Sequence, residues 1–416
     1  RIFFLGQLPS EYSYSIAGQL SWVNLLYEIL SEAIILPLFY FIGQVGQDKS
    51  ALSNRVRTGL IVTFAVFAVL SALIISFANS LLRWMAADDS ILSASVAYIR
   101  IESVASIFSM MANFGLVVLV TLNKEKYVYI ITGAKVLLCI LADTFLVSTL
   151  PFSANLGVNG IGVSNIIVNV LLLGVTIGIL YKEGIRVFTK EKLEFAWMRE
   201  FGKIGGISGL ESLVRNLAYM LMVVRMVNVV NEQGTYWVAN NFIWGWLLLP
   251  VTQLAELVKR DVAADKKAIE EKTLGYFFIT FIICVVWCVS IPLWKPFMAN
   301  VLQYSDVDKL FSLVLILLGF YVLYAFQNVF DATFYGLGKT HYMAFESIVT
   351  NAIYYVGAFL LYLTGVWVPT LTGIALLFGI GMAFDSVVSF GAYWFLLKKN
   401  GWDLLRISSE EREDKQ

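Results

Sequence analysis

The sequence is poor in charged residues, and this scarcity narrows the class of protein. Asp, Glu, Lys and Arg make up 14% of the 416 residues, whereas soluble domains contain about 25%. There is one histidine, and the three cysteines (Cys139, Cys284 and Cys288) all lie within apolar runs. This number and spacing exclude a disulfide framework and the usual zinc motifs. The formal net charge of zero gives no reason to expect a nucleic-acid partner.

Motifs of enzymes are also missing. We find no catalytic triad, no phosphate-binding loop and no metal motif, and Gly157–Gly162 (GVNGIG) is too short and wrongly placed for a nucleotide turn. The polar loops are short, and the polar tail at 398–416 is too small for a catalytic domain. We therefore expect neither enzymatic activity nor a cofactor.

Long apolar runs dominate the rest of the sequence. Hydrophobic residues make up 59% of the chain, and the mean hydropathy is +0.75. A helix needs about 20 apolar residues to cross a bilayer, and continuous runs favour helices over an alternating β-barrel pattern. The sequence predicts an all-α polytopic membrane protein. The eleven predicted spans are 15–44, 57–82, 92–121, 127–150, 158–181, 204–231, 236–258, 274–297, 308–336, 342–366 and 369–397.

Basic residues alternate between the loops and predict the orientation. The loops near 45–57, 122–126, 182–203, 259–272 and 337–340 carry Lys or Arg, whereas those at 151–157, 231–235 and 364–370 carry none. Basic loops stay on the cytoplasmic side of a membrane. We therefore expect a multi-pass protein of the plasma (inner) membrane with its C-terminus in the cytoplasm.

Three span junctions recur at a nearly constant offset of 213–215 residues, which predicts an internal repeat. The second copy contains six predicted spans and the first contains five, so we expect one further helix before residue 15, missing from this chain. Two six-helix bundles of the same orientation form a parallel pseudo-repeat, which is a plan of secondary transporters. The matched segments are 37–60 with 250–273, 119–130 with 334–345, and 157–162 with 370–375.

The repeat also predicts the domain organisation. We expect an N-terminal transmembrane lobe at 1–184, a cytoplasmic linker at 185–200, a C-terminal six-span lobe at 201–397 and a cytoplasmic tail at 398–416. Pro37 and Pro250 occupy equivalent positions in the two copies, and proline interrupts helical hydrogen bonding. A kink is therefore expected at the same place in both copies.

The two-lobe plan, the linker IGQVGQDKSALSNRVRTGL at 42–60 and the LADTFLV segment at 141–147 resemble the multidrug and toxic compound extrusion (MATE) transporters. The resemblance covers residues 10–400. It implies a V-shaped pair of six-helix bundles that exchanges organic substrates, often cationic, for sodium ions or protons. It also implies that Asp143 is the acid of the lobe's fifth helix, with Cys139 at the family's Asn position and Asn165 near its Thr position. Asp143 and Asn165 would then hold the sodium ion.

Ionisable side chains inside apolar spans are the main functional candidates, because each costs about 2.5–3.5 kcal/mol to insert. Lys135 precedes Asp143 by about two turns, and could tune its charge or form a structural pair. Glu28 and Glu32 lie one turn apart; they either line the cleft and aid a cation, or pair with Lys135 or another buried base. The predicted cation-coupling residues are Asp143, Asn165, Glu28, Glu32 and Lys135.

A second group is predicted to line the substrate cavity. Glu211 and Arg215 lie one turn apart, either as a stabilising pair or as a cavity pair that opens when a charge arrives. Gln327, Asn328 and Asp331 place three polar groups within five residues of an oily span, and the repeat sets Asn113 opposite Asn328. Trp244 could contact planar cations. The predicted cavity residues are Glu211, Arg215, Asp331, Gln327, Asn328, Asn113 and Trp244.

The function expected from these features is cation-coupled export of small organic compounds, cationic or amphiphilic, by alternating access. The expected partners are the small-molecule substrate and the lipid bilayer, with the protein acting as a monomer. The alternative is a flippase or exporter of the same superfamily for a lipid-linked or anionic substrate, because Lys135, Arg215 and Arg225 could face an anionic head group.

Overall fold

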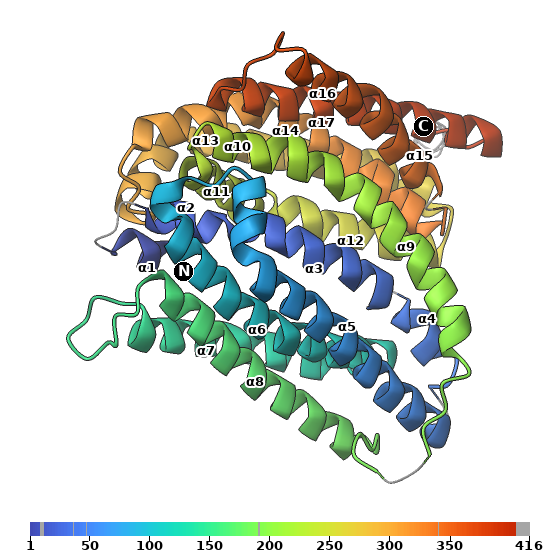
Figure 1. Ribbon diagram of the computed structural model, residues 1–416. Coiled ribbons are helices and arrows are strands. Elements are labelled where there is room, and N and C mark those ends of the chain that lie inside the picture. The colour runs from blue at the N-terminus through green and yellow to red at the C-terminus, as the bar shows by residue number, and fades with distance from the viewer. Residues whose placement is uncertain (9–11, 36, 47, 190–191, 340, 405–416) are drawn as a thin grey trace. The chain divides into compact units, whose positions relative to one another are not determined.

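The computed structural model describes residues 1–8, 12–35, 37–46, 48–189, 192–339 and 341–404. These residues form helices and connecting turns, without a strand among them. They divide into two compact units, residues 1–220 and 221–416. Figure 1 shows the helices of both units as long ribbons.

The first unit consists mainly of helices long enough to cross a bilayer. A helix satisfies its backbone hydrogen bonds internally, which an apolar run in lipid requires. Asp48 and Asp88 cap the first turns of α5 and α6 with their carboxylates. The helices are α1 (Ile2–Gly6), α2 (Ser13–Gly18), α3 (Leu20–Ile34), α4 (Leu38–Gly43), α5 (Lys49–Trp84), α6 (Asp89–Thr121), α7 (Glu125–Leu146), α8 (Val158–Lys182) and α9 (Met198–Tyr219).

The second unit begins within a π-helical stretch and contains two more of them. Asp306 caps α14, and Thr370 caps α17. Its elements are η1 (Met220–Val224), α10 (Arg225–Val229), α11 (Gln233–Phe242), η2 (Ile243–Leu247), α12 (Leu249–Ala264), α13 (Ala268–Asn300), α14 (Val307–Gly336), α15 (His341–Val349), η3 (Thr350–Tyr355), α16 (Val356–Leu363) and α17 (Leu371–Asn400).

Nine of the eleven predicted spans are confirmed as helices apolar and long enough to cross a membrane, among the residues described. The prediction of an all-helical polytopic membrane protein is therefore confirmed. The spans predicted at 15–44 and 236–258 were wrong as single helices, because non-helical residues interrupt each of them.

Both interruptions lie at the repeat-related prolines, as the sequence predicted. The first falls between α3 and α4 at Pro37, and the second falls at η2, just before Pro250 of α12. The indole N–H of Trp287 donates to the carbonyl of Leu247 at 3.0 Å. This bond satisfies a backbone acceptor at the break, as a membrane interior demands.

A buried chain of hydroxyl groups connects three helices of the first unit. The Tyr27 hydroxyl of α3 lies 2.6 Å from the Ser71 hydroxyl of α5, and Ser71 donates to the carbonyl of Ser103 on α6 at 2.9 Å. The side chains of Tyr27 and Ser71 are almost fully buried. Hydrogen bonds of this kind fix helix contacts in an apolar surrounding.

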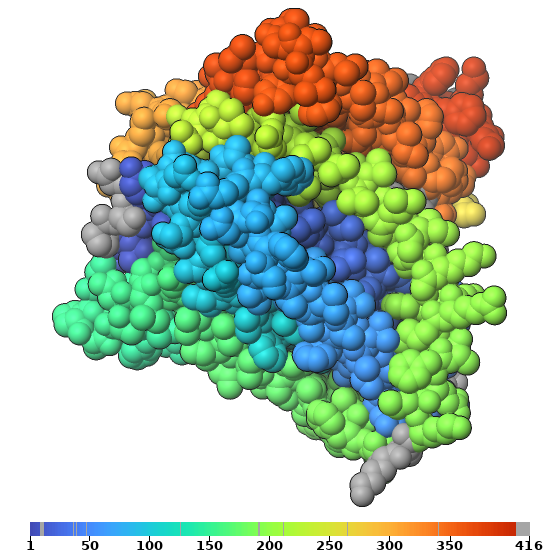
Figure 2. All heavy atoms as spheres, in the orientation of Figure 1, coloured from blue at the N-terminus to red at the C-terminus, as the bar shows by residue number. Residues whose placement is uncertain are grey.

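Helix α9 packs along α3 (Figures 1 and 2). A Cβ atom on Gly205 would lie 2.1 Å from the carbonyl oxygen of Ala33, and one on Gly209 would lie 2.7 Å from the Ala33 Cβ. Two glycines four residues apart allow this approach. The contact boundary therefore falls after α9, whereas the predicted 185–200 linker marks the boundary of the sequence repeat.

The linker before α9 is attached to the first unit by polar bonds. Asn54 donates to the carbonyl of Glu194 and accepts from its N–H, both at 3.0 Å. The indole N–H of Trp197 donates to the Thr58 hydroxyl at 3.1 Å. These contacts position the start of α9 against α5.

Candidate functional site

Three helices of the first unit bring together two carboxyl groups and an amide. Glu102 of α6 is 4% exposed, and both its oxygens accept from the Asn165 amide of α8 at 2.7 and 2.9 Å. Asp143 of α7 is 1% exposed and accepts from Arg1 Nε at 3.1 Å. Its second oxygen, Oδ1, is buried without a hydrogen-bond partner among the described residues. We refer to Glu102, Asp143, Asn165 and Arg1 as the first-unit carboxyl site.

The structure supports part of the sequence prediction for this site and adds two members. Asp143 and Asn165 belong to the same polar cluster, but Asn165 bonds Glu102 instead of Asp143. Lys135 is exposed on α7, and the base that contacts Asp143 is Arg1. Cys139 accepts from the Arg1 guanidinium at 3.4 Å. The sequence analysis did not select Glu102, although an acidic residue inside an apolar run is a signal that could have identified it.

Glu32 forms an ion pair with Arg215 of α9. Glu28 and Glu32 were expected either to line the cleft or to pair with a base. The contact with Arg215 favours pairing for Glu32. Glu28 is exposed. The side chain of Glu211 lies outside the described residues, so its predicted pairing with Arg215 stays a prediction. The ion pair joins the two helices that the glycines bring together.

A second and larger cluster of acids lies in the second unit. Gln327 of α14 donates from Nε2 to Asp385 of α17 at 2.7 Å and to Asp331 at 3.3 Å. Ser389 donates to Asp331 at 3.0 Å, and Thr350 donates to Asp385 at 2.6 Å. These bonds bring together side chains from α14, η3 and α17.

Glu346 of α15 completes the cluster and is 3% exposed. It lies close enough to Asp331 and Asp385 for their charges to interact, while its Oε1 is buried without a hydrogen-bond partner among the described residues. None of Asp331, Glu346 and Asp385 forms an ion pair with a described base. Neighbouring carboxylates repel one another when all are ionised, so a cluster of three without a base favours a proton on at least one of them.

The sequence had placed Gln327 and Asp331 in the substrate cavity but left Glu346 and Asp385 unassigned. We refer to Gln327, Asp331, Glu346 and Asp385 as the second-unit acid cluster. Two of the acids, Glu346 and Asp385, come from α15 and α17, which follow α14 in the chain, so only the tertiary packing brings them together. The described side chains include no group of His, Cys, Asp and Glu arranged to hold a metal ion.

The remaining cavity candidates do not join this cluster. Asn328 donates to the carbonyl of Tyr324 on its own helix at 3.0 Å, and Asn113 is exposed on α6. Trp244 is 42% exposed and donates from Nε1 to the Tyr321 hydroxyl at 3.1 Å. The rings of Trp244, Tyr321 and Tyr324 form an aromatic group on η2 and α14.

The comparisons with known proteins agree with this architecture. The family model described as MatE matches residues 43–145, which run from the end of α4 to Asp143 and its neighbours in α7. A solved inward-facing conformation of a multidrug resistance MATE family transporter of the MOP superfamily is 18% identical, with a TM-score of 0.77. The alignment covers 99% of this chain and 94% of that chain. This chain has the MATE fold and carries a MatE region.

Two further MATE-fold structures show the same likeness. An outward-facing conformation of a multidrug resistance MATE family transporter is 17% identical, with a TM-score of 0.67, over 95% of this chain and 90% of that chain. A MOP superfamily transporter from Pyrococcus furiosus is 18% identical, with a TM-score of 0.69 and the same two coverages. The reverse polarity of that transporter's binding pocket suggests a different function for it. No curated protein matches the sequence significantly.

Proposed function

We propose that this multi-pass membrane protein is a secondary antiporter. It uses a gradient of protons or sodium ions to export small organic compounds, cationic or amphiphilic, by alternating access. The observation that carries the proposal is the second-unit acid cluster, in which three carboxyl groups lie close together without a described base beside them. The MATE fold supports it, since solved structures with this fold include inward-facing and outward-facing conformations of a transporter.

The coupling follows from the charge that each cluster can carry inside a membrane. A proton that leaves the acid cluster exposes a carboxylate to an apolar surrounding, which is costly unless water or a cation reaches it. At the first-unit carboxyl site, an arriving cation competes with Arg1 for Asp143. Cation binding therefore favours one conformation over another, and export requires that substrate favours the opposite one.

Dye efflux from proteoliposomes under separate proton and sodium gradients tests the proposal. We expect Asp331→Asn to lower proton-driven efflux, because the amide cannot release a proton. Asp308→Asn is the matched control, since Asp308 lies on the same helix and its partner Lys295 is exposed to solvent. Asp143→Asn should abolish cation-driven efflux without loss of folded protein. Unchanged gradient-driven efflux in both Asp331→Asn and Asp143→Asn would contradict cation coupling at these sites.

A second function, export of a lipid-linked or anionic substrate, is favoured by the bases on the membrane helices. The Arg215 side chain, which pairs with Glu32, is 36% exposed, and it would be the base that an anionic head group meets. Binding of purified protein to a cationic dye or to a polyprenyl-phosphate lipid separates the two functions. We further propose location in the plasma (inner) membrane with a cytoplasmic C-terminus, monomeric function, and no resident cofactor or nucleic-acid partner.

A further inference from the structure

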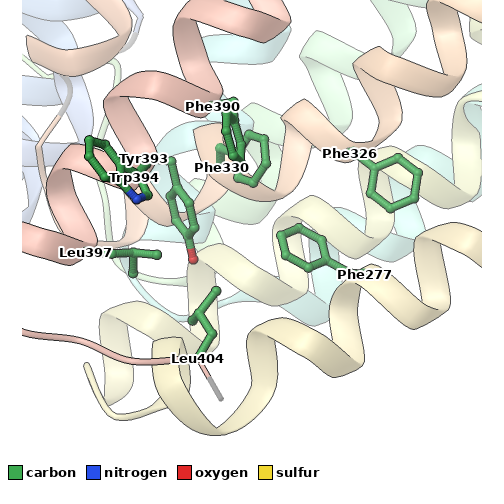
Figure 3. A pocket seen from close by; sticks show the side chains of 8 residues that line it. All are labelled: Phe277, Phe326, Phe330, Phe390, Tyr393, Trp394, Leu397 and Leu404. Atoms are coloured by element: carbon green, nitrogen blue, oxygen red, sulfur yellow. The ribbon is translucent and has the colours of Figure 1, made fainter. Parts of the chain in front are cut away.

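An aromatic groove in the second unit is lined by none of the acid-cluster side chains. Its volume is about 390 Å³, and only aromatic and leucine side chains line it. Figure 3 shows these side chains converging from three helices and the segment after α17. We refer to them as the aromatic groove: Phe277 of α13, Phe326 and Phe330 of α14, Phe390, Tyr393, Trp394 and Leu397 of α17, and Leu404.

Contacts between aromatic rings fix the positions of the side chains that line the groove. Phe330 lies 5.7 Å from Phe277, 6.0 Å from Phe390 and 4.7 Å from Tyr393, measured between ring centroids. Phe330 and Tyr393 are almost fully buried at the back, whereas Phe390 and Trp394 are each 57% exposed at the front. Rings supported on several sides keep their positions. The groove is therefore a preformed apolar slot that opens at the surface.

Four lysines gather beside this slot, at the end of the unit where α17 finishes. Lys398 Nζ lies 5.1 Å from the ring of Trp394, which lines the groove. Lys339 Nζ lies 6.0 Å from the ring of Trp402, which packs beside Leu397 and Leu404. Partial burial lowers the pKa of Lys339, and the charges of Lys399 and Lys266 lower it further. The charges of Lys266, Lys339 and Lys399 therefore act on one another, and Lys398 directly precedes Lys399 in the chain.

These lysines have no acidic partner in the described part of the chain. None of the four forms an ion pair there. The acid beside them, Glu270, accepts from the backbone N–H of Asp403 at 3.0 Å. Like charges held together without a counterion create a site for an anion. On this membrane protein the lysines adjoin an apolar groove. A phospholipid with an anionic head group could place its head group at the lysines and an acyl chain in the groove.

We propose that the aromatic groove binds one acyl chain of an anionic phospholipid, whose phosphate group contacts the lysines at 398 and 399. The predicted orientation puts this site in the cytoplasmic leaflet, where anionic lipids attract basic side chains. A lipid bound here remains in place, and is distinct from any transported substrate. The back wall of the groove, Phe330, precedes Asp331 of the acid cluster directly, so a bound chain would also brace α14 beside that acid.

Tryptophan quenching by brominated lipids tests this site on the full chain. Purified protein in micelles is titrated with phosphatidylglycerol or with phosphatidylcholine, both carrying the same brominated chains. The contribution of Trp394 is the difference between the wild-type protein and Trp394→Phe. We expect phosphatidylglycerol to quench Trp394 at no more than a tenth of the phosphatidylcholine concentration. Equal quenching by the two lipids would show ordinary lipid contact and overturn the proposal.

The lysines are tested with the double variant Lys398→Gln and Lys399→Gln. We expect its affinity for phosphatidylglycerol to fall about 30-fold, the factor for two lysines that each contribute about fivefold. The matched control is Lys124→Gln with Lys126→Gln, at the start of α7 in the first unit, which should leave the affinity unchanged. A double variant at 398 and 399 that keeps its lipid preference contradicts the assignment.

A salt titration of the wild-type protein gives an independent readout if the double variant fails to fold. Salt screens exposed charges, so the preference for phosphatidylglycerol should decrease between low and high salt while binding of phosphatidylcholine stays constant. A preference that salt does not change would exclude the lysines as its source.

Discussion

The glycine contact between α9 and α3 makes a quantitative prediction. The Cβ of Gly205→Ala would lie 2.1 Å from the Ala33 carbonyl oxygen, which is 0.9 Å short of the 3.0 Å below which real Cβ contacts essentially never occur. The obstacle is backbone, so the helices must separate. Overpacking of this kind costs about 1–3 kcal/mol. We expect Gly205→Ala to lower the free energy of unfolding by about this amount relative to its neighbour Gly206→Ala.

Gly206→Ala is the matched control, because a Cβ there meets no atom within 4 Å. Both substitutions gain the same helix propensity, up to about 1 kcal/mol, so the difference between them isolates the packing cost. The measurement is the unfolding of the purified variants in detergent as the denaturing detergent fraction is raised. Equal midpoints for the two variants would refute the close approach of α9 and α3.

A rescue experiment sharpens this test. The Cβ of Gly209→Ala would meet the Ala33 Cβ at 2.7 Å, whereas that of Gly205→Ala meets the Ala33 carbonyl oxygen. Adding Ala33→Gly removes the Ala33 Cβ but leaves the carbonyl oxygen of residue 33 in place. We therefore expect Ala33→Gly to restore the stability of Gly209→Ala but not of Gly205→Ala. Rescue of both variants, or of neither, would contradict the observed geometry.

Three further predictions follow from the ion pairs and the first-unit carboxyl site. A double-mutant cycle of Glu32→Gln and Arg215→Gln on the free energy of unfolding should give a coupling energy of about 1 kcal/mol or less, because both side chains are partly exposed and solvent screens the pair. A coupling energy of zero would show that the contact contributes nothing to stability. Lys124 donates to Glu183 and lowers the pKa of that carboxyl below 4.5, so the stabilisation is present above about pH 4.5 and is lost as the pH falls through the lowered pKa. The melting temperatures of wild type and Glu183→Gln should then differ at pH 7 and converge near pH 3, and a constant difference would argue against the pair. Glu102→Gln should shift the cation dependence of efflux while its melting temperature stays close to that of wild type, whereas loss of stability alone would assign Glu102 a structural role.

The sequence was sufficient for the fold because the bilayer imposes a simple rule. A segment that crosses lipid must be apolar over a fixed length, and nine such segments are found as predicted. Hydropathy did not show that the spans at 15–44 and 236–258 are interrupted, because it measures the length of an apolar segment and not the continuity of the helix. Their prolines, at 37 and 250, did predict the positions of the breaks.

The candidate sites were only partly predictable, because they depend on contacts between helices. Asp143 was recognised from its family resemblance, but Glu102 is brought beside it only by the packing of α6 against α7 and α8. Glu346 and Asp385 are separate acids in the sequence, and their meeting with Asp331 depends on how α15 and α17 surround α14. The repeat likewise matched Asn113 with Asn328 without predicting that the first is exposed and the second bonds its own helix.

The packing of α9 has a consequence for the order of folding. By sequence, α9 opens the second copy of the repeat, yet it completes the surface of α3 in the first unit through Ala33 and Glu32. During synthesis, the first unit therefore stays incomplete until the residues up to about 219 have been inserted into the membrane. A fragment ending at residue 184 would leave the α3 surface uncovered, with the Glu32 carboxylate lacking its base. Dividing the gene between the repeat copies would thus divide a folding unit, whereas dividing it after α9 would not.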